Sequence, residues 1–290
     1  MGETLVEQPS DGQLLELIDK DSLPPCPTVL LAAMEEIRKP TVNFRRLSAV
    51  ISQDPGLSSA MIRTANSSYF SRRSKTRSVQ RALIVLGLET VKEIVTDVAL
   101  RHTFDVGSAV SMERFWERAN YFAKMCCSLA AELTSLPQEE AHTFGLFRDA
   151  GIPLLMQRLP NYKDTLRIAN EGTGQSFISV EEHRHGANHA VVGYRLALKW
   201  SLSETVCNAI LHHHDAPMLV DFGDGIPTEV SNLIALGVLA EHLTNTFLRR
   251  PTETEWQKAL PIALRHVELS EAEFDALSHD IFSGLHSRQC

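Results

Sequence analysis

The sequence predicts an all-α protein, and three observations carry this prediction. Apolar side chains recur at intervals of three and four residues along most of the chain, which is the period of a helix with one buried face. No convincing run of alternating apolar and polar residues indicates a strand, and no Asn-Gly or Asp-Gly turn joins such runs. Ser or Thr followed three residues later by Glu or Gln, a signal for helix starts, occurs at several plausible places.

A helix is expected to begin at Pro55. Asp54 has a side chain that can accept the unpaired N–H groups of a first turn, and proline is favoured at the first helical position. The inward face of this helix is then marked by Leu57, Met61, Thr64 and Ala65.

Two further helices are expected on either side of Gly87. Ser78 can cap the first, whose apolar face carries Val79, Ala82, Leu83 and Leu86. Gly87 is expected to end that helix, because glycine is common just past a helix C-terminus. Thr90 and Glu93 then form a capping box for the next helix, with apolar positions at Val91, Ile94, Val95 and Val98.

Four more capping boxes predict helix starts in the rest of the chain. They pair Ser135 with Gln138, Ser179 with Glu182, Ser201 with Glu204, and Ser270 with Glu273. Residues 221–227 are rich in turn-forming residues and predict a linker. The helix expected after this linker has its apolar positions at Ile234, Leu236, Leu239, Leu243 and Phe247.

The chain divides into three predicted regions. Residues 1–14 form an N-terminal extension. Residues 15–216 form one helical domain, with a first part over 15–105 and a second part over 111–216 that holds both histidine clusters. Residues 217–290 form a C-terminal helical extension.

Bulk properties exclude several classes of protein. A net charge of −8 argues against a generic nucleic-acid binder. The five cysteines show no CxxC spacing and are typical of a reducing compartment. No apolar run approaches the length of a membrane span, and the start lacks the pattern of a secretory signal. We therefore expect a cytoplasmic protein with no membrane role, for which binding to nucleic acid is not favoured.

The first histidine cluster comprises His183, His185 and His189. If Ser179 caps a helix, then Glu182, His185 and His189 share one face of it, an arrangement that could hold a metal. The more ordinary interpretation, which we favour, is a polar stripe that packs against a neighbouring helix.

The second cluster is His212-His213-His214. Successive helical residues point about 100° apart, so three in a row cannot all face one cavity. His213 shares a face with Val206 and Ile210 and is expected to be the inward one. A core histidine that is hydrogen-bonded to the backbone or a carboxylate is favoured here over a metal ligand.

A basic segment stands out in this acidic protein. From residue 60 to 103 there are eight Lys and Arg against three acids, a net charge of +5. Its densest part is an expected loop with Arg72, Arg73, Lys75 and Arg77, which could bind phosphate, an acidic partner or RNA. A solvated loop without a partner is an equally good interpretation.

Arg148-Asp149 lies where a metal-binding His-Asp pair would need histidine. A guanidinium has no lone pair to donate and repels a divalent ion. The residue pair therefore argues against a metal-dependent hydrolase, although the histidine clusters by themselves would suggest one.

Taken together, the motifs resemble the HDOD family, the HD-related output domain of bacterial signalling proteins. The resemblance covers roughly residues 15–216 and follows the order of the family's motifs. These are Leu23-Pro24-Pro25-Cys26-Pro27, Ile51 to Leu57, Ala65 to Phe70, Ala82 to Gly87, Phe115-Trp116, Gly145-Leu146-Phe147, Glu182, Gly186, His189, Val192-Gly193, Trp200-Ser201-Leu202 and Ala209-Ile210 with His212-His213.

The resemblance implies an all-α, HD-like domain related to the HD and HD-GYP phosphohydrolases. It places Arg118 at the first metal-ligand position and Arg148 at the histidine of the His-Asp pair, so both ligand positions are degenerate. Asp149, His185, His189 and His213 are then vestigial candidates for metal ligands, with no metal, cofactor or catalytic residue expected. Arg118 or Arg148 is expected to pair instead with Asp149 or Glu182.

These features favour a non-catalytic regulatory module of a bacterial signalling pathway that binds protein partners. The alternative is a divergent metal-dependent phosphohydrolase or cyclic-dinucleotide phosphodiesterase that uses Asp149, His185, His189 and His213. In a third interpretation, the pocket of the degenerate metal site binds a nucleotide second messenger, with Arg118 and Arg148 contacting its phosphate.

Overall fold

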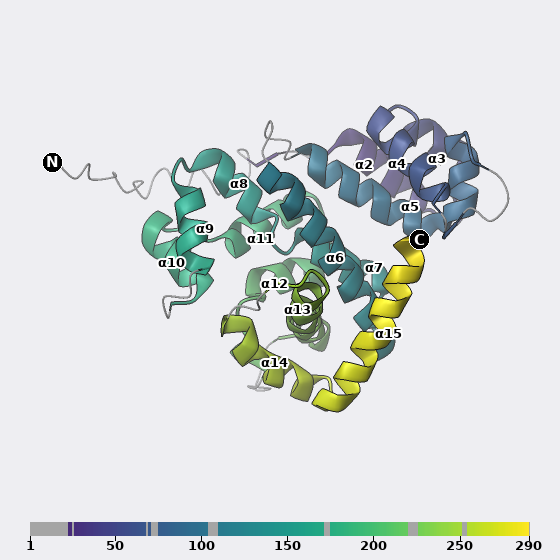
Figure 1. Cartoon of the computed structure of the whole chain (residues 1–290). Helices are drawn as coiled ribbons and strands as arrows, with labels where there is room; N and C mark the ends of the chain where they lie inside the picture. Colours follow the sequence, from purple (N-terminus) through teal and green to yellow (C-terminus); the bar gives the residue numbers. More distant parts are fainter. Residues whose placement is uncertain are drawn as a thin grey trace.

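The computed structural model describes residues 23–24, 26–67, 69–70, 75–103, 110–170, 175–219, 226–250 and 254–289. Helices connected by short turns account for the regular structure of these residues, and none of them lies in a strand (Figure 1). The predicted all-α class is therefore confirmed. The predicted extension over residues 1–14 lies outside the described part of the chain.

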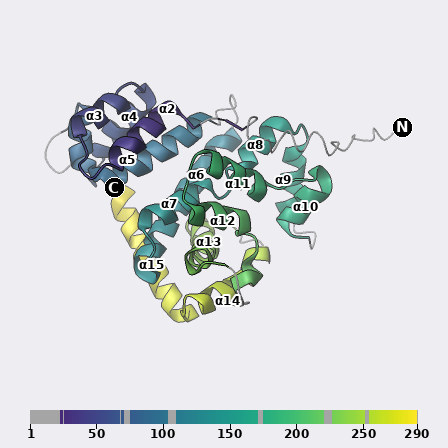
Figure 2. The same cartoon turned by 180° about the vertical axis from the view of Figure 1, so that it is seen from behind.

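The first helices form a group at one end of the molecule, as both views show (Figures 1 and 2). They are α2 (Thr28–Ile37), α3 (Phe44–Ile51), α4 (Pro55–Ala65) and the first half of α5 (Val79–Thr103). The start of α4 is as predicted, because Asp54 Oδ1 accepts the N–H of Leu57 at 2.8 Å and Pro55 is the first helical residue. Leu57, Met61 and Ala65 point into the core.

Gly87 breaks α5, as the sequence predicts, but the helix resumes at once. The backbone at Gly87 has φ 76° and ψ 164°, a conformation that glycine adopts at little cost because it has no Cβ. Thr90 therefore lies inside the helix, and the predicted start at a Thr90–Glu93 capping box is wrong. Ser78 does cap the first half, since its hydroxyl accepts the N–H of Arg81 at 3.3 Å.

The second group of helices holds the histidine clusters. It begins with the long helix α6 and continues through shorter helices to one turn of 3₁₀ helix. The elements are α6 (Val110–Leu133), α7 (Gln138–Phe147), α8 (Gly151–Arg158), α9 (Tyr162–Asn170), α10 (Phe177–His185), α11 (His189–Lys199), α12 (Glu204–His212) and η1 (Ala216–Leu219).

Three of the predicted helix starts in this region and beyond are displaced. Pro137 precedes α7, Ser176 caps α10 and Ser203 caps α12, in place of the predicted Ser135, Ser179 and Ser201. A hydroxyl can cap only where the following backbone turns into a helix, and a four-residue pattern does not locate that point. The box at Ser270 is confirmed, because Ser270 and Glu273 exchange backbone-to-side-chain bonds at the start of α15.

The last three helices are α13 (Thr228–Phe247), α14 (Thr254–His266) and α15 (Glu271–Gln289). Helix α13 packs against α6, α7, α12 and α14, and most of its residues are buried on all sides. Although the sequence places α13 in a C-terminal extension, it contributes to the same core as the helices that precede it. The position of the predicted domain boundaries stays a prediction.

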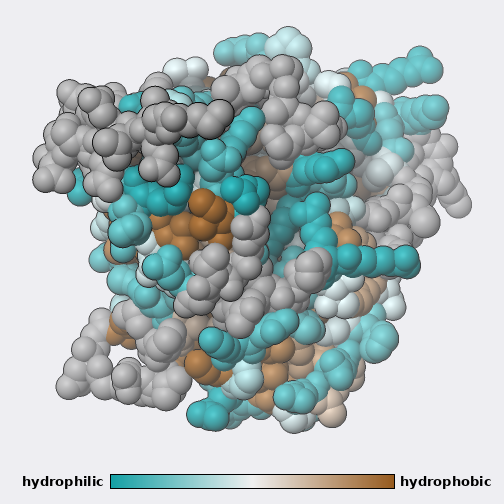
Figure 3. All heavy atoms as spheres, turned by 60° about the vertical axis from the view of Figure 1, so that its left-hand side comes forward, coloured by the Kyte–Doolittle hydropathy of each residue, from teal (hydrophilic) through white to brown (hydrophobic). Residues whose placement is uncertain are grey.

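Figure 3 shows the molecule from the side on which α8, α9 and α10 lie in Figure 1. Among the coloured side chains of this face, hydrophilic ones predominate and hydrophobic ones gather in smaller patches. Within the described residues, no helix combines the length and the apolar character that crossing a membrane requires.

Candidate functional site

The ends of four helices, α7, α8, α11 and α12, and the middle parts of α6 and α13 meet around Asp149 and Arg148. Asp149 lies in the turn between α7 and α8, directly after Arg148, which ends α7. His189 is the first residue of α11, and His213 follows the last residue of α12. The backbones approach closely here because Gly151 has no side chain, and a Cβ at that position would overlap the carbonyl group of His189. Helix ends from distant parts of the sequence thereby form one site.

His189 is held from behind by a buried carboxylate. Glu181 Oε2 accepts both the backbone N–H of His189 at 3.1 Å and its ring Nδ1–H at 2.7 Å. Glu181 has no exposed surface, and its other oxygen accepts the hydroxyl of Tyr162. Burial alone would lower the pKa of His189, but the charge of Glu181 outweighs it and raises that pKa. The result is an imidazole fixed in orientation, with Nε2 pointing into the site.

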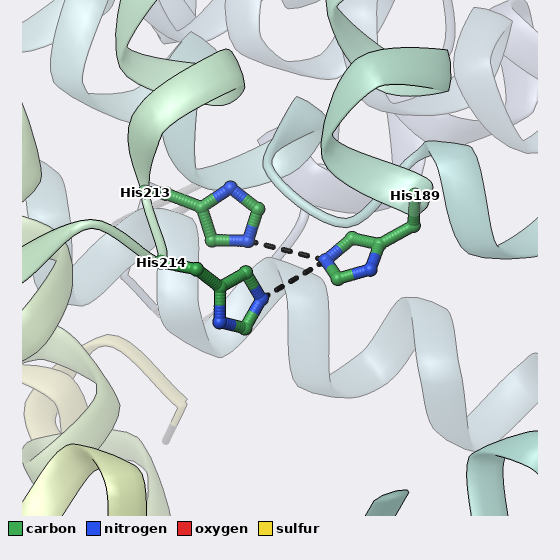
Figure 4. A group of neighbouring side chains, drawn as sticks. All are labelled: His189, His213 and His214. Atoms are coloured by element: carbon green, nitrogen blue, oxygen red, sulfur yellow. Dashed lines mark hydrogen bonds between the residues drawn. The ribbon is translucent and has the colours of Figure 1, made fainter. Parts of the chain in front are cut away.

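His213 and His214 approach the same point from the end of α12. The Nε2 atom of His189 lies 3.2 Å from Nε2 of His213 and 3.1 Å from Nε2 of His214 (Figure 4). His213 is buried, its Nδ1–H donates to the carbonyl of Ile210 at 2.7 Å, and burial together with the neighbouring His214 holds its pKa well below the usual value. The three rings form a cluster whose ligand atoms lie within 4.8 Å of one another.

The expectation that His213 is the inward residue of this cluster is confirmed, but the exclusion of His214 was wrong. Helix α12 ends at His212, so the chain turns after it and the 100° spacing no longer applies. His212 instead contacts Asp215 at 3.2 Å near the surface.

The first histidine cluster is not arranged as the sequence predicts. Gly186, with φ 65°, ends α10 directly after His185, so His189 begins a different helix. His185 Nε2 lies 2.7 Å from the hydroxyl of Thr165, and the triad contains His189 alone from this cluster. Glu182 accepts a bond from Asn188, and it is Glu181 that faces His189.

Two arginines occupy the other side of Asp149. Arg148 is 4% exposed and makes a bidentate contact with Asp149, with Nε to Oδ1 at 3.2 Å and Nη2 to Oδ2 at 2.8 Å. Arg118 Nη1 lies 3.9 Å from Asp149 Oδ2. The predicted pairing of arginine with Asp149 is therefore confirmed, whereas Glu182 is not a partner in it.

A second carboxylate, Glu241 of α13, completes this network. Arg148 Nη2 donates to its Oε2 at 3.0 Å, Arg118 bonds to its Oε1, and the side chain is 1% exposed. Burial would raise the pKa of Glu241, but the two guanidinium groups lower it. The sequence reasoning missed Glu241, although an acid directly after the apolar stretch Leu233 to Ala240 was a usable signal.

The same balance acts on Asp149. Burial would raise its pKa, but the charge of Arg148 holds that pKa well below the usual value. Asp149 is therefore an ionised carboxylate between two guanidinium groups and the histidine rings, with Oδ1 3.7 Å from His189 Nε2 and 3.5 Å from His213 Nε2.

The basic loop lies apart from this site in the sequence. Lys75 and Arg77 are exposed, on either side of the buried Thr76. Arg72 and Arg73 lie outside the residues that the structure describes. The predicted binding role of all four stays a prediction.

Comparison with protein families gives a match to the model of the HDOD domain over residues 23–216. A curated relative from Treponema pallidum, an uncharacterized protein, is 24% identical over 204 residues, which span 68% of this chain and 38% of that protein. The chain thus matches well under half the length of this relative.

Solved structures show the same fold. An HDOD domain protein of unknown function from Geobacter sulfurreducens superposes with a TM-score of 0.71 at 20% identity, covering 96% of both chains. A candidate phosphohydrolase from Shewanella amazonensis gives 0.71 at 20% identity, covering 97% of this chain and 96% of that one. A candidate signal transduction protein from Marinobacter aquaeolei gives 0.67 at 19% identity, covering 100% of this chain and 63% of that one.

Proposed function

The chain belongs to the HDOD domain family, and from this premise we propose that it is a cytoplasmic, non-catalytic module of bacterial signal transduction. It acts by binding partner proteins. The solved structure named as a candidate signal transduction protein is consistent with this function but, at 19% identity, contributes the fold alone.

The observation that carries the proposal is the pairing of Arg118 and Arg148 with both carboxylates of the site. Guanidinium groups stay charged at any physiological pH and cannot coordinate a metal. Here they hold Asp149 and Glu241 in contacts of 2.8 and 3.0 Å from Arg148 alone. Carboxylates engaged in this way are poorly placed to hold the pair of metal ions that activates water in two-metal hydrolysis.

Partner binding is proposed to use the exposed basic surface before α5, which includes Lys75 and Arg77. The test is quantitative affinity capture from the native bacterial host with the full chain. We expect His189→Gln to retain the captured partners and the double variant Lys75→Glu, Arg77→Glu to lose them. The matched control, Lys258→Glu with Arg265→Glu, makes the same charge change at exposed positions of α14 and should retain them. Loss of partners in the control but not in the loop variant would contradict the proposal.

A second candidate function is a divergent phosphohydrolase, and the histidine cluster is the observation that favours it. A solved structure of this fold is named as a candidate phosphohydrolase. Purified protein supplied with Mn²⁺, Fe²⁺ or Zn²⁺ and a cyclic dinucleotide separates the two functions. Turnover that disappears in His189→Gln would establish the enzyme, and no turnover above that variant is expected for the regulatory module.

A nucleotide sensor that holds phosphate through Arg118 and Arg148 is less well supported. Both guanidinium groups already contact carboxylates, so a phosphate would have to displace Asp149 or Glu241. Calorimetric titration with cyclic dinucleotides is expected to show no binding heat.

A further inference from the structure

The ligand nitrogens of His189, His213 and His214 lie within 4.8 Å of one another, and Oδ1 of Asp149 lies 3.7 Å from Nε2 of His189 and 3.5 Å from Nε2 of His213. We propose that His189, His213, His214 and Asp149 bind a single divalent transition-metal ion of the zinc class, and that Arg118 and Arg148 fill the adjacent position that a second ion would need. This inference goes beyond the proposed regulatory function and does not depend on it.

The hydrogen bonds of two rings determine where their lone pairs point. A backbone carbonyl can only accept, so His213 carries its proton on Nδ1, which faces the carbonyl of Ile210 at 2.7 Å. Nδ1 of His189 likewise donates to the carboxylate of Glu181. In their neutral forms, both rings then direct an Nε2 lone pair into the site across 3.2 Å. Two facing lone pairs repel unless a metal ion or a proton on one Nε2 lies between them.

The spacing of the four atoms fits a tetrahedral ion. Bonds of about 2.0–2.1 Å at tetrahedral angles separate the ligand atoms by roughly 3.3 Å. The observed separations are 3.1 and 3.2 Å between nitrogens and 3.5 and 3.7 Å between nitrogen and Asp149 Oδ1. These four separations need only small adjustments to bind such an ion, and the ligand nitrogens of His213 and His214 lie within 4.8 Å of each other.

The groups that hydrogen-bond to two of the rings also match those found behind metal-binding histidines. A carboxylate or carbonyl behind a ligating imidazole fixes its tautomer and orientation, and Glu181 and the Ile210 carbonyl supply this support for His189 and His213. Imidazole ligands favour zinc and its neighbours over magnesium or calcium. His214 is only partly buried, so an ion at this place can be exchanged with solvent on its side.

The arginines limit the site to one ion. Asp149 Oδ1 accepts from Arg148 Nε at 3.2 Å and keeps a second lone pair for the ion. Asp149 Oδ2 and both oxygens of Glu241 also contact guanidinium nitrogens, so none of the three is available to a second ion. A second divalent ion there would face two permanent positive charges. Arg118 and Arg148 thus balance the carboxylate charge that a second metal would otherwise neutralise.

The experiment uses the full chain without a histidine tag, stripped of metal with a chelator and dialysed against Zn²⁺ or Co²⁺. Elemental analysis is expected to find about one ion per chain, and the Co²⁺ form should show the visible absorption of tetrahedral coordination. His214→Ala should lower metal affinity by at least roughly tenfold, and Glu181→Gln, behind His189, by roughly 10–100-fold.

The matched control is His212→Ala, which removes an imidazole two residues away that contacts Asp215. It should bind metal like the unmodified chain, and circular dichroism verifies that each variant is folded. The assignment is overturned if the folded, unmodified chain takes up no ion, if it takes up two, or if folded His214→Ala binds as tightly as His212→Ala.

Discussion

Arg148 illustrates how a charge can be buried in this core, since its side chain is only 4% exposed. Its guanidinium contacts Asp149 and Glu241 and lies over the ring of Phe122, 3.9 Å from the ring centroid. Removing a charge from water costs several kcal/mol, and the cost is recovered only when good partners surround it. Arg148 is therefore tied to its partners, and its effect on stability depends on both carboxylates.

Replacing Glu241 tests this dependence. Glu241→Gln leaves Arg148 and Arg118 with one ionised partner in place of two, and we expect the free energy of unfolding to fall by about 3 kcal/mol. The measurement is denaturant unfolding. The control is Glu229→Gln in the exposed first turn of the same helix, where a change within 0.5 kcal/mol is typical of surface positions. Equal effects of the two substitutions would refute a buried ion network.

His142 on α7 gives a prediction about pH. Burial, with Lys124 and Lys92 nearby, lowers its pKa from 6.5 to about 4. The unfolded chain then binds a proton below pH 6.5 while the folded chain does not, so stability is lost as the pH falls from 6.5 toward 4. The loss from this group is on the order of 3 kcal/mol at most.

His142→Gln should remove this part of the pH dependence, so that stability measured from pH 7 to pH 4 falls less steeply than in the unmodified chain. The exposed His279, replaced in the same way, serves as the control and should leave the slope unchanged. A slope that is the same in all three proteins would show that His142 titrates normally.

At the scale of the helices, the histidines and Asp149 of the site lie at the ends of helices. Helix α7 ends before Asp149, α11 begins at His189, and α12 ends before His213. Chain direction changes at such ends, so consecutive residues such as His213 and His214 can both turn toward one point, which they cannot do inside a helix. Short helices are thus what allow this cluster to form.

Gly151 controls how closely two of these helices approach. A Cβ at this position would overlap the carbonyl group of His189, which is backbone and cannot rotate away. Gly151→Ala should therefore separate α8 from α11 and destabilise the protein by about 1–3 kcal/mol in thermal or denaturant unfolding. Gly284 of α15 has open space around it, and Gly284→Ala should be neutral or stabilising by up to about 1 kcal/mol. If Gly284→Ala destabilised the protein more than Gly151→Ala, the close contact at Gly151 would be ruled out.

At the scale of the whole molecule, α13 completes the core and the ion network together. The family match ends at residue 216, yet α13 packs on α6, α7 and α12 and supplies Glu241. The HDOD protein from Geobacter sulfurreducens aligns over 96% of this chain, so helices beyond the matched domain belong to the shared fold.

Truncation distinguishes α13 from the helices at the C-terminus. A chain ending at residue 226 loses the buried face of α13 and leaves Arg118 and Arg148 without Glu241, so we expect no cooperative unfolding transition. A chain ending at residue 268 loses α15, where the buried side chains among those described are Phe274 and Ile281, each worth about 1.5–3 kcal/mol. This second chain should remain folded, with a lower melting temperature by calorimetry. If it failed to fold, α15 would be as necessary for folding as α13, which would contradict the prediction.

The sequence by itself determined the helical class, because the period of apolar residues is a local property that survives any arrangement of the helices. It also determined the caps at Asp54 and Ser270 and the pairing of Arg148 with its neighbour Asp149, since each involves residues close in the chain. Only the tertiary structure decided that Glu181, His214 and Glu241 face the site. Their directions depend on where α10 and α12 end and on how α13 packs, and these follow from contacts between segments far apart in the sequence.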